Sequence, residues 1–304
     1  MKRLLALSLT IVFCVLYAGA QIDQATRGGS SGRLPHDLDQ KVKAQAAGKT
    51  TTIFYHGGPV MVASTNLYIV YYGGFTSNQH AILDTFLKNI GGSPAFNVNT
   101  EYFNSTNQHV QNILNYNPAS ASFDDAYSLG TSLSGSFVTT ILHNAVAGGH
   151  FPADVNGIYI LTVSPDVKLP KSVWCAYHSH TTSAIVSGMD IKYALAADPP
   201  ASVLTSCSGN LATFHDTTSP NGDVGMDEVV DSLIHELSET VTDPDGSAWF
   251  TSNGSENGDL CNFVYGTTFI APNGSHANHT FGGLNYLAQE IWSMANPVGC
   301  VLSH

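Results

Sequence analysis

One stretch in the second half of the chain, residues 220–249, restricts the fold most. It opens on the turn signal Pro-Asn-Gly-Asp and reaches Pro244, which cannot extend a helix, so the sequence predicts a helix over residues 226–242. Apolar side chains recur along it at helical spacing, at Val230, Leu233, Ile234, Leu237 and Val241. Polar side chains recur every four residues on a neighbouring face, at Asp227, Asp231, His235 and Glu239. A core has to cover the apolar stripe, and this requirement sets the direction of the polar face.

The polar face contains a pattern that is typical of metal-binding helices. His235, Glu236 and Glu239 form the string His-Glu-x-x-Glu, which has the layout of the zincin motif His-Glu-x-x-His with a carboxylate as second ligand. One helical turn places such side chains about 5–6 Å apart at their Cβ atoms, as a metal requires. We therefore expect His235 and Glu239 to be metal ligands and Glu236 to be the general base for a water molecule. The alternative is a solvated polar face, in which Asp227 and Asp231 merely favour the helix dipole.

Three acidic residues are candidates for the third ligand. Asp259 is the first choice, because its distance in sequence from Glu239 is similar to the ligand spacing of thermolysin-like zincins. Asp245, at the position where metzincins carry a ligand, and Glu256 are the alternatives. Zinc is the expected cofactor, but one histidine and two carboxylates make a hard, anionic site for which calcium or manganese is also conceivable.

Other histidines are weaker candidates. His178 and His180 alternate on a predicted strand and face the same side, so we expect them to assist the site. His56 and His215 stand alone and are interpreted as hydrogen-bonded structural groups.

The N-terminal region predicts a secreted protein. Residues 1–20 combine Lys2 and Arg3, an apolar run and an Ala-x-Ala cleavage site, which is the layout of a signal peptide. Residues 21–50 are polar and predict a disordered leader or linker, and residues 51–304 predict a globular domain. The formal net charge of −12 becomes more negative once the signal peptide is removed. This charge argues against nucleic acid and anionic membranes as partners.

Cysteines and sequons fit an extracellular chain. Cys14 belongs to the signal peptide, which leaves Cys175, Cys207, Cys261 and Cys300. Three pairings are possible; local order favours Cys175–Cys207 and Cys261–Cys300, and free buried cysteines are the alternative. Candidate glycosylation sites occur at Asn104, Asn253, Asn273 and Asn278.

The order of elements predicts a mixed α/β fold. Buried strands are expected at residues 66–72 and 157–163, amphipathic helices at 78–90 and 135–146, and antiparallel strands at 173–178 and 184–196. Less regular stretches predict a strand pair at 51–57 and 60–63, a short helix at 108–116, a loop at 197–219 and short strands at 263–300. We expect a single zincin-like domain of the α/β (α+β) class. It would have a twisted mixed sheet, backing helices and a central His-Glu helix.

Several motifs resemble one known family. These are YHGGPV at 55–60, NLYIVYYGGF at 66–75, IYILTVSPDV at 158–167, CAYHSH at 175–180, the block at 220–244, GDLC at 258–261 and a final IW…C at 291–300. Together they resemble the EXORDIUM or phosphate-induced protein family, known mainly from plants. The resemblance implies a protein secreted to the cell wall or apoplast and linked to growth and carbon status. The chain has Cys-Ala-Tyr-His-Ser where plant members carry Cys-Gly-Phe-His-Gly, which indicates a non-plant homologue.

Two functions of different classes remain open. The first is a zinc-dependent hydrolase, most naturally a peptidase acting on an extracellular peptide or protein. The second is a non-catalytic extracellular protein that binds a cell-wall glycan or a surface partner and holds at most a structural metal. Bound metal together with turnover of a generic peptide would separate them.

Overall fold

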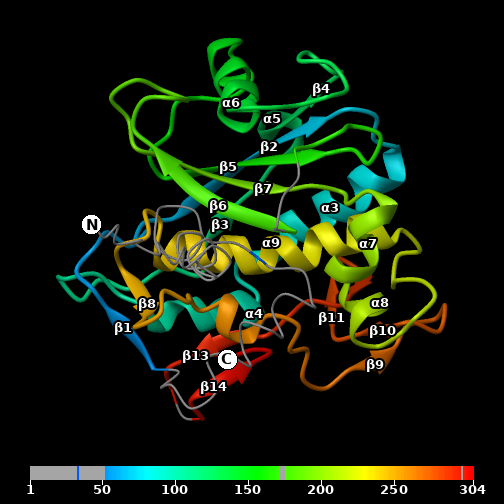
Figure 1. The fold of residues 1–304 in the computed structure, drawn as a ribbon. Coiled ribbons are helices and arrows are strands. Elements are labelled where there is room, and N and C mark those ends of the chain that lie inside the picture. The colour runs from blue at the N-terminus through cyan, green and yellow to red at the C-terminus, as the bar shows by residue number, and fades with distance from the viewer. Residues whose placement is uncertain (1–32, 34–51, 171–174, 296) are drawn as a thin grey trace, which may run out of the picture.

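A six-stranded sheet lies between helices on both faces (Figure 1). The computed structural model describes residues 33, 52–170, 175–295 and 297–304. Helix α6 (Phe137–Ala147) packs on one face of the sheet, and α3 (Ser77–Ile90) and α9 (Val224–Thr242) pack on the other. The expected mixed α/β architecture is therefore confirmed.

The sheet has one antiparallel edge. Its strand order is β3-β2-β5-β7-β6, and β4 pairs with the end of β2. The strands are β2 (Thr65–Tyr72), β3 (Leu114–Asn115), β4 (Ser122–Asp125), β5 (Gly157–Val163), β6 (Ala176–Thr181) and β7 (Ile191–Ala196). Every pairing is parallel except that of β6 with β7, which is antiparallel as predicted. The second of these strands was predicted from residue 184 but begins at Ile191. Strand β6 thus ends the sheet on the side of α9.

Strand β2 explains why the chain needs two helical layers. Leu67, Ile69 and Tyr71 face the core shared with α3 and α9. Val70 and Tyr72 face the core shared with α6. Because both faces are covered, the strand reads as a continuous apolar run, and the strands expected at 66–72 and 157–163 are confirmed as β2 and β5.

Helix α9 is buried all round. The Asp223 carboxylate caps it by accepting a hydrogen bond from Met226 N at 3.1 Å, and the helix ends at Thr242 before Pro244. Every residue from Gly225 to Thr242 is buried. The interpretation of a solvated polar face is therefore wrong. Buried polar side chains need partners, so the surroundings of α9 have to supply them.

The predicted strand pair near the start of the domain is wrong. Strand β1 (Ile53–Tyr55) pairs instead with β8 (Trp249–Thr251), almost two hundred residues later in the chain. Residues 60–63 form no strand, and Met61 N donates to Val241 O at the end of α9. Local sequence cannot reveal this pairing, because the partner is distant.

Two other local predictions fail. Residues 108–116 are not helical; they contain β3, which pairs with the start of β2. Residues 197–219 are not only loop, because they contain α7 (Ala201–Cys207) and α8 (Gly209–Ala212). Segments this short have little hydrophobic periodicity, and tertiary contacts decide their structure.

The remaining elements are short. They are α4 (Pro94–Asn97), η1 (Val98–Glu101), α5 (Pro118–Ala121), η2 (Asp259–Cys261), β9 (Phe269–Ile270), β10 (His276–Ala277), β11 (His279–Phe281), β12 (Leu284–Tyr286), β13 (Ile291–Ser293) and β14 (Gly299–Val301). The six strands pair as three antiparallel hairpins, which confirms the short strands expected over 263–300.

The signal peptide and most of the leader lie outside the described residues, so this division of the chain stays a prediction. Arg33 is the described residue of the leader, and it is fully buried. In the part of the chain that the structure describes, no helix has both the length and the apolar composition needed to cross a membrane.

Both disulfides form as local order suggested. Cys175 bonds to Cys207 before strand β6, and Cys261 bonds to Cys300 at the C-terminal hairpin. The second bridge attaches η2, which carries Asp259, to β14.

We expect paired serine substitutions of Cys261 and Cys300 to lower the free energy of unfolding by about 2–5 kcal/mol, because the unfolded chain regains loop entropy. Urea unfolding of the oxidised protein would measure the loss. Alkylation of the unreduced, denatured wild type should label none of the four cysteines, and labelled thiols would contradict the pairing.

Candidate metal centre

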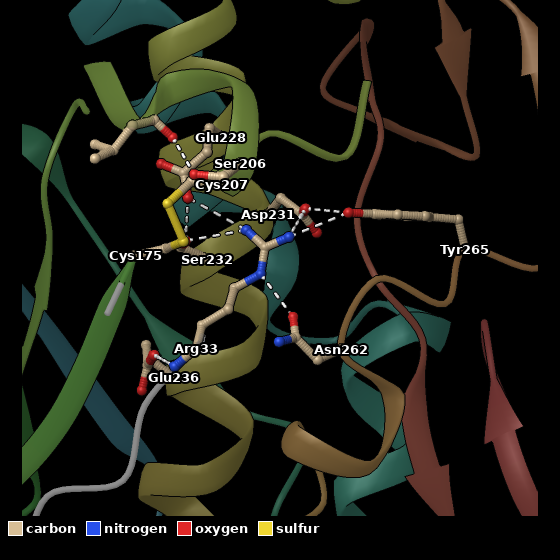
Figure 2. Close-up of a disulfide and its surroundings, with 11 residues drawn as sticks. Arg33, Cys175, Ser206, Cys207, Glu228, Asp231, Ser232, Glu236, Asn262 and Tyr265 are labelled. Carbon is tan, nitrogen blue, oxygen red and sulfur yellow. Dashed lines mark hydrogen bonds and ion pairs between the residues drawn. A yellow bond between two sulfur atoms is a disulfide. The ribbon is translucent and has the colours of Figure 1, made fainter. Parts of the chain in front are cut away.

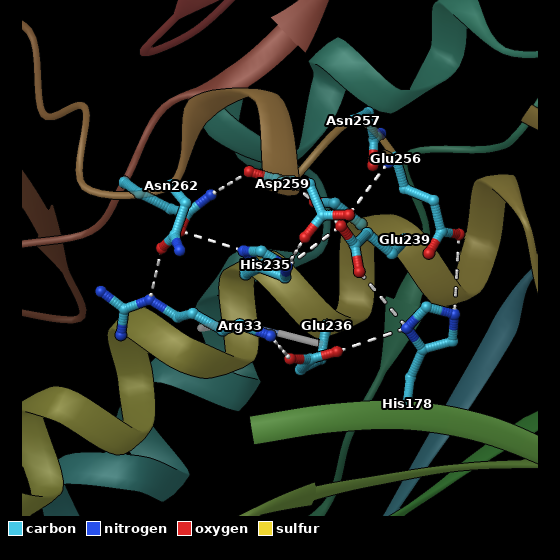
Figure 3. A network of polar contacts seen from close by, with 12 residues as sticks. Arg33, His178, His235, Glu236, Glu239, Glu256, Asn257, Asp259 and Asn262 are labelled. Atoms are coloured by element: carbon cyan, nitrogen blue, oxygen red, sulfur yellow. Dashed lines mark hydrogen bonds and ion pairs between the residues drawn. The ribbon is translucent and has the colours of Figure 1, made fainter. Parts of the chain in front are cut away.

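A cluster of acidic and imidazole side chains lies between α9, β6 and the segment around η2 (Figure 3). Helix α9 contributes His235, Glu236 and Glu239, each with no exposed surface. Strand β6 contributes His178, and η2 contributes Asp259, whose side chain is 17% exposed. Two turns of one helix therefore meet two segments that are distant in sequence.

The structure brings the three predicted ligands together. His235 Nε2 lies 3.0 Å from Glu239 Oε1 and 3.6 Å from Asp259 Oδ1. One ligand atom from each of the three residues lies within 4.8 Å of the others, a spacing at which a single ion can contact all three. The group can hold a metal, while its occupancy stays a prediction.

A second group shares Glu239 with the first. His178 Nδ1 lies 3.3 Å from Glu236 Oε2 and 3.4 Å from Glu239 Oε2. One ligand atom from each of these three residues likewise lies within 4.8 Å of the other two. On the other side of the ring, His178 Nε2 lies 3.8 Å from Glu256 Oε1. The two carboxylate oxygens of Glu239 thus face one imidazole each.

Gln289 determines the tautomer of His235. The side-chain nitrogen of Gln289 donates to the carbonyl of Gly258 at 2.9 Å, so its oxygen is the atom that faces His235 Nδ1 at 3.1 Å. His235 Nδ1 must then carry a proton, and in the neutral ring Nε2 has a lone pair. Among the described residues, this buried Nε2 atom has no hydrogen-bond partner in suitable geometry. A lone pair that faces two carboxylates needs a cation or a proton between them.

The cluster has more acidic than basic side chains. Burial by itself would lower the pKa of His178, but hydrogen bonds to Glu236 and Glu239 outweigh it and raise the pKa to about 10. Burial likewise opposes the proton of His235, but attraction by Glu239 raises its pKa to about 9. Burial raises the pKa of Asp259 well above its ordinary value, and the charge of Glu239 adds to this effect. Burial also opposes the charge of Glu239, but attraction by His235 outweighs it and lowers the pKa of Glu239 to about 2. The cluster therefore combines an anionic Glu239 with an Asp259 carboxyl group that resists ionisation.

The other predicted residues lie at different distances from the cluster. Glu256 is buried beside His178 and remains an alternative ligand. Asp245 accepts a hydrogen bond from Ser247 and belongs to neither group of possible ligands among the described residues. His180 Nδ1 lies 2.7 Å from Asp190 Oδ1. Among the described contacts, this pairing gives no support to the assisting role expected of His180.

The four sequons stay predictions, and their surroundings differ. Asn273 lies in an exposed turn, although its amide nitrogen donates to the Ser219 carbonyl at 2.7 Å. The amide nitrogen of Asn278 donates to the carbonyls of Tyr265 and Ala288, so it is a poor acceptor for a glycan.

Gly258, in the motif GDLC, is required by the cluster. A Cβ atom at this position would lie 2.9 Å from Glu239 Oε1 and 2.9 Å from the His235 ring. No side chain fits there without displacing the two ligands.

Comparison with known proteins now decides the family. The family model described as phosphate-induced protein 1 conserved region matches residues 53–294. This chain belongs to the phosphate-induced protein 1 family. The match contains every residue of the cluster and Gln289, whereas Arg33 lies before it. The resemblance indicated by the sequence motifs is thereby confirmed.

Plant members of the phosphate-induced protein 1 family are similar over most of this chain. Protein EXORDIUM-like 3 of Arabidopsis thaliana is 25% identical over an aligned length of 288 residues, and the match covers 84% of this chain and 85% of the plant protein. Protein EXORDIUM-like 5 of the same plant is 26% identical over an aligned length of 291 residues, and the match covers 84% of this chain and 79% of the plant protein. Protein PHOSPHATE-INDUCED 1 of Nicotiana tabacum is 24% identical over an aligned length of 216 residues, and the match covers 64% of this chain and 66% of the tobacco protein. No solved structure matches the chain.

Sequence reasoning missed two residues that matter in this family member. Gln289 lies among short strands without any motif, and only its contact with His235 reveals its role. Arg33 falls in the predicted leader, yet its backbone N–H donates to Glu236 Oε1 at 3.1 Å. No local signal marks either residue, because both act through contacts across the fold.

We expect Gln289→Leu to destabilise the protein, because it removes the partners of His235 Nδ1 and of the Gly258 carbonyl. Each buried group left unpaired should cost about 1–3 kcal/mol in the free energy of unfolding. Urea unfolding would measure it, with exposed Gln111→Leu as the matched control, expected within about 0.5 kcal/mol of wild type. Equal losses in the two variants would argue against the role of Gln289.

Proposed function

We propose that this chain is a secreted, metal-dependent hydrolase that acts on peptide bonds. The observation that carries the proposal is the orientation of His235, whose Nδ1 atom is committed to Gln289 and whose Nε2 atom faces Glu239 and Asp259. Two carboxylates and an imidazole around one point are an established donor set for a divalent metal.

The proposed roles follow from position. His235, Glu239 and Asp259 would hold the metal, which when bound polarises a carbonyl group and lowers the pKa of a water molecule. Glu236 is the next residue on the same helix and would accept the proton of the attacking water and pass it to the departing nitrogen. His178 contacts Glu236 and carries a raised pKa, so as a cation it would donate a hydrogen bond to the substrate oxygen.

The surroundings support a peptide as substrate. Strand β6 is the antiparallel edge of the sheet and lies beside α9, so the candidate site has an edge strand next to it. An edge strand can bind an extended peptide through main-chain hydrogen bonds. The two disulfides and the predicted signal peptide favour an extracellular place of action.

A non-catalytic extracellular protein with a structural metal is the second candidate. Its supporting observation is the complete burial of His235, Glu236 and Glu239, because structural metal sites are closed whereas catalytic ones keep an open position.

We expect the purified protein to carry about one divalent cation per chain, held in part by the helical pair at 235 and 239. Elemental analysis and titration with zinc, calcium and manganese would identify it. His235→Ala should lose the ion. His180→Ala is the control and should keep it, because His180 lies on β6 like His178 but pairs with Asp190. Protein that none of the three metals can load would refute the site.

We expect Glu236→Gln to keep the metal and the fold but to lower peptide hydrolysis by at least about 100-fold, because it removes only the base. The assay is extended incubation of metal-loaded protein with a peptide library, read by mass spectrometry. Bound metal with no hydrolysis, and no effect of Glu236→Gln, would support the non-catalytic alternative.

A further inference from the structure

A second acidic site lies on α9, one to two turns before the cluster, and Arg33 fills it (Figure 2). The guanidinium group ion-pairs with Glu228 through Nη1 at 3.2 Å and with Asp231 through Nη2. The side chain of Arg33 has no exposed surface. A cation from the start of the chain is therefore enclosed by the same helix that carries the candidate metal ligands.

The pocket fits the shape of a guanidinium group and not only its charge. Arg33 Nε donates to Asn262 Oδ1 at 3.1 Å, and Nη2 also donates to the Tyr265 hydroxyl at 3.1 Å. The guanidinium carbon lies 4.5 Å from the centre of the Phe263 ring. Each guanidinium nitrogen thus has its own acceptor, and the guanidinium carbon lies over the Phe263 ring. A lysine, with one nitrogen, could satisfy only part of this set.

The backbone of Arg33 is bound at both its carbonyl oxygen and its N–H. Its carbonyl oxygen accepts a hydrogen bond from Cys175 N, directly before edge strand β6, at 2.7 Å. Its N–H donates at 3.1 Å to Oε1 of Glu236, which is the candidate base (Figure 3). The peptide nitrogen nearest to Glu236 is therefore the nitrogen of an arginine residue.

A cavity lies next to the residue that binds the arginine carbonyl. Cys175, which binds that carbonyl, also lines a cavity of about 590 Å³ together with apolar side chains such as Val167, Leu169 and Leu195. A peptide that continues past the arginine along this edge would meet a largely apolar surface.

We propose that this pocket is the specificity subsite of the site on α9 and takes an arginine side chain, and that Arg33 occupies it as a built-in competitor of substrate. The proposal rests on the proposed hydrolase function. The arginine would supply the nitrogen of the cleaved bond. The oxygen of one water molecule bonds to the preceding carbonyl carbon, the C–N bond breaks, and Glu236 transfers a proton from that water to the nitrogen. The products are a carboxylate and a free arginine amine, so a substrate has to displace Arg33 before it can bind.

The test uses the full chain and three peptides: acetyl-Gly-Arg-Leu-amide and its lysine and alanine counterparts. Calorimetry should show that Arg33→Ala binds the arginine peptide about 100-fold more tightly than the other two, because several charge-assisted hydrogen bonds select it. Wild type should bind it much more weakly, because its pocket is filled. Lys192→Ala is the matched control, since Lys192 pairs with Asp190 outside the pocket, and it should behave as wild type.

Two further variants keep the test decisive. Adding Asp231→Asn to Arg33→Ala should lower the preference for arginine at least tenfold. Arg33→Ala leaves two buried carboxylates without a cation, and this loss can prevent folding. Arg33→Lys keeps the buried charge and is therefore measured in the same experiments. Folded variants without a preference for arginine would show that Arg33 is a structural clasp. Variants that fail to fold, and that the arginine peptide does not rescue, would show the same.

Turnover separates this proposal from the one on which it rests. The metal-loaded Arg33→Ala protein should cleave the arginine peptide faster than wild type does. Arginine-selective binding without any cleavage would keep the subsite and refute the hydrolase. Cleavage without preference among the three peptides would keep the hydrolase and refute the subsite.

Discussion

The burial of acidic groups on α9 is the constraint on which the rest of the structure depends. A carboxylate in the protein interior is unstable unless a cation or several hydrogen-bond donors accompany it. Glu228 and Asp231 have the guanidinium group of Arg33, and Glu239 has the imidazoles of His178 and His235. The chain therefore has to bring a residue from its start, one from strand β6 and the loop around η2 to one helix.

This arrangement places the guanidinium site and the candidate metal centre on successive turns of one helix. The acidic pair nearer the start of α9 binds a guanidinium group, and the residues nearer its end form the candidate metal centre. Glu236 lies between them and contacts both the backbone of Arg33 and the ring of His178. A rigid helix holds these groups at constant distances. A site that recognises a side chain and cleaves the adjacent peptide bond would require such constant distances.

The contacts of Arg33 also bring a second segment against Glu236. With Arg33 in place, the candidate base is fully buried, and the edge of the sheet beside it already has a main-chain partner at Cys175. The family model matches the region that carries the cluster, whereas Arg33 precedes that region. The candidate metal ligands and Arg33 thus belong to separate parts of the chain.

The sequence by itself determined the elements whose signals are local. The periodicity of residues 226–242 predicted α9, continuous apolar runs predicted β2 and β5, and the string at 235–239 predicted which side chains would meet Asp259. Only the tertiary structure decided that the polar face of α9 is buried, that β1 pairs with β8, and that Gln289 and Arg33 contact the site. The physical reason is the range of the interactions. Helix periodicity and ligand spacing are set within a few residues, whereas burial and the pairing of charges depend on segments that only the folded chain brings together.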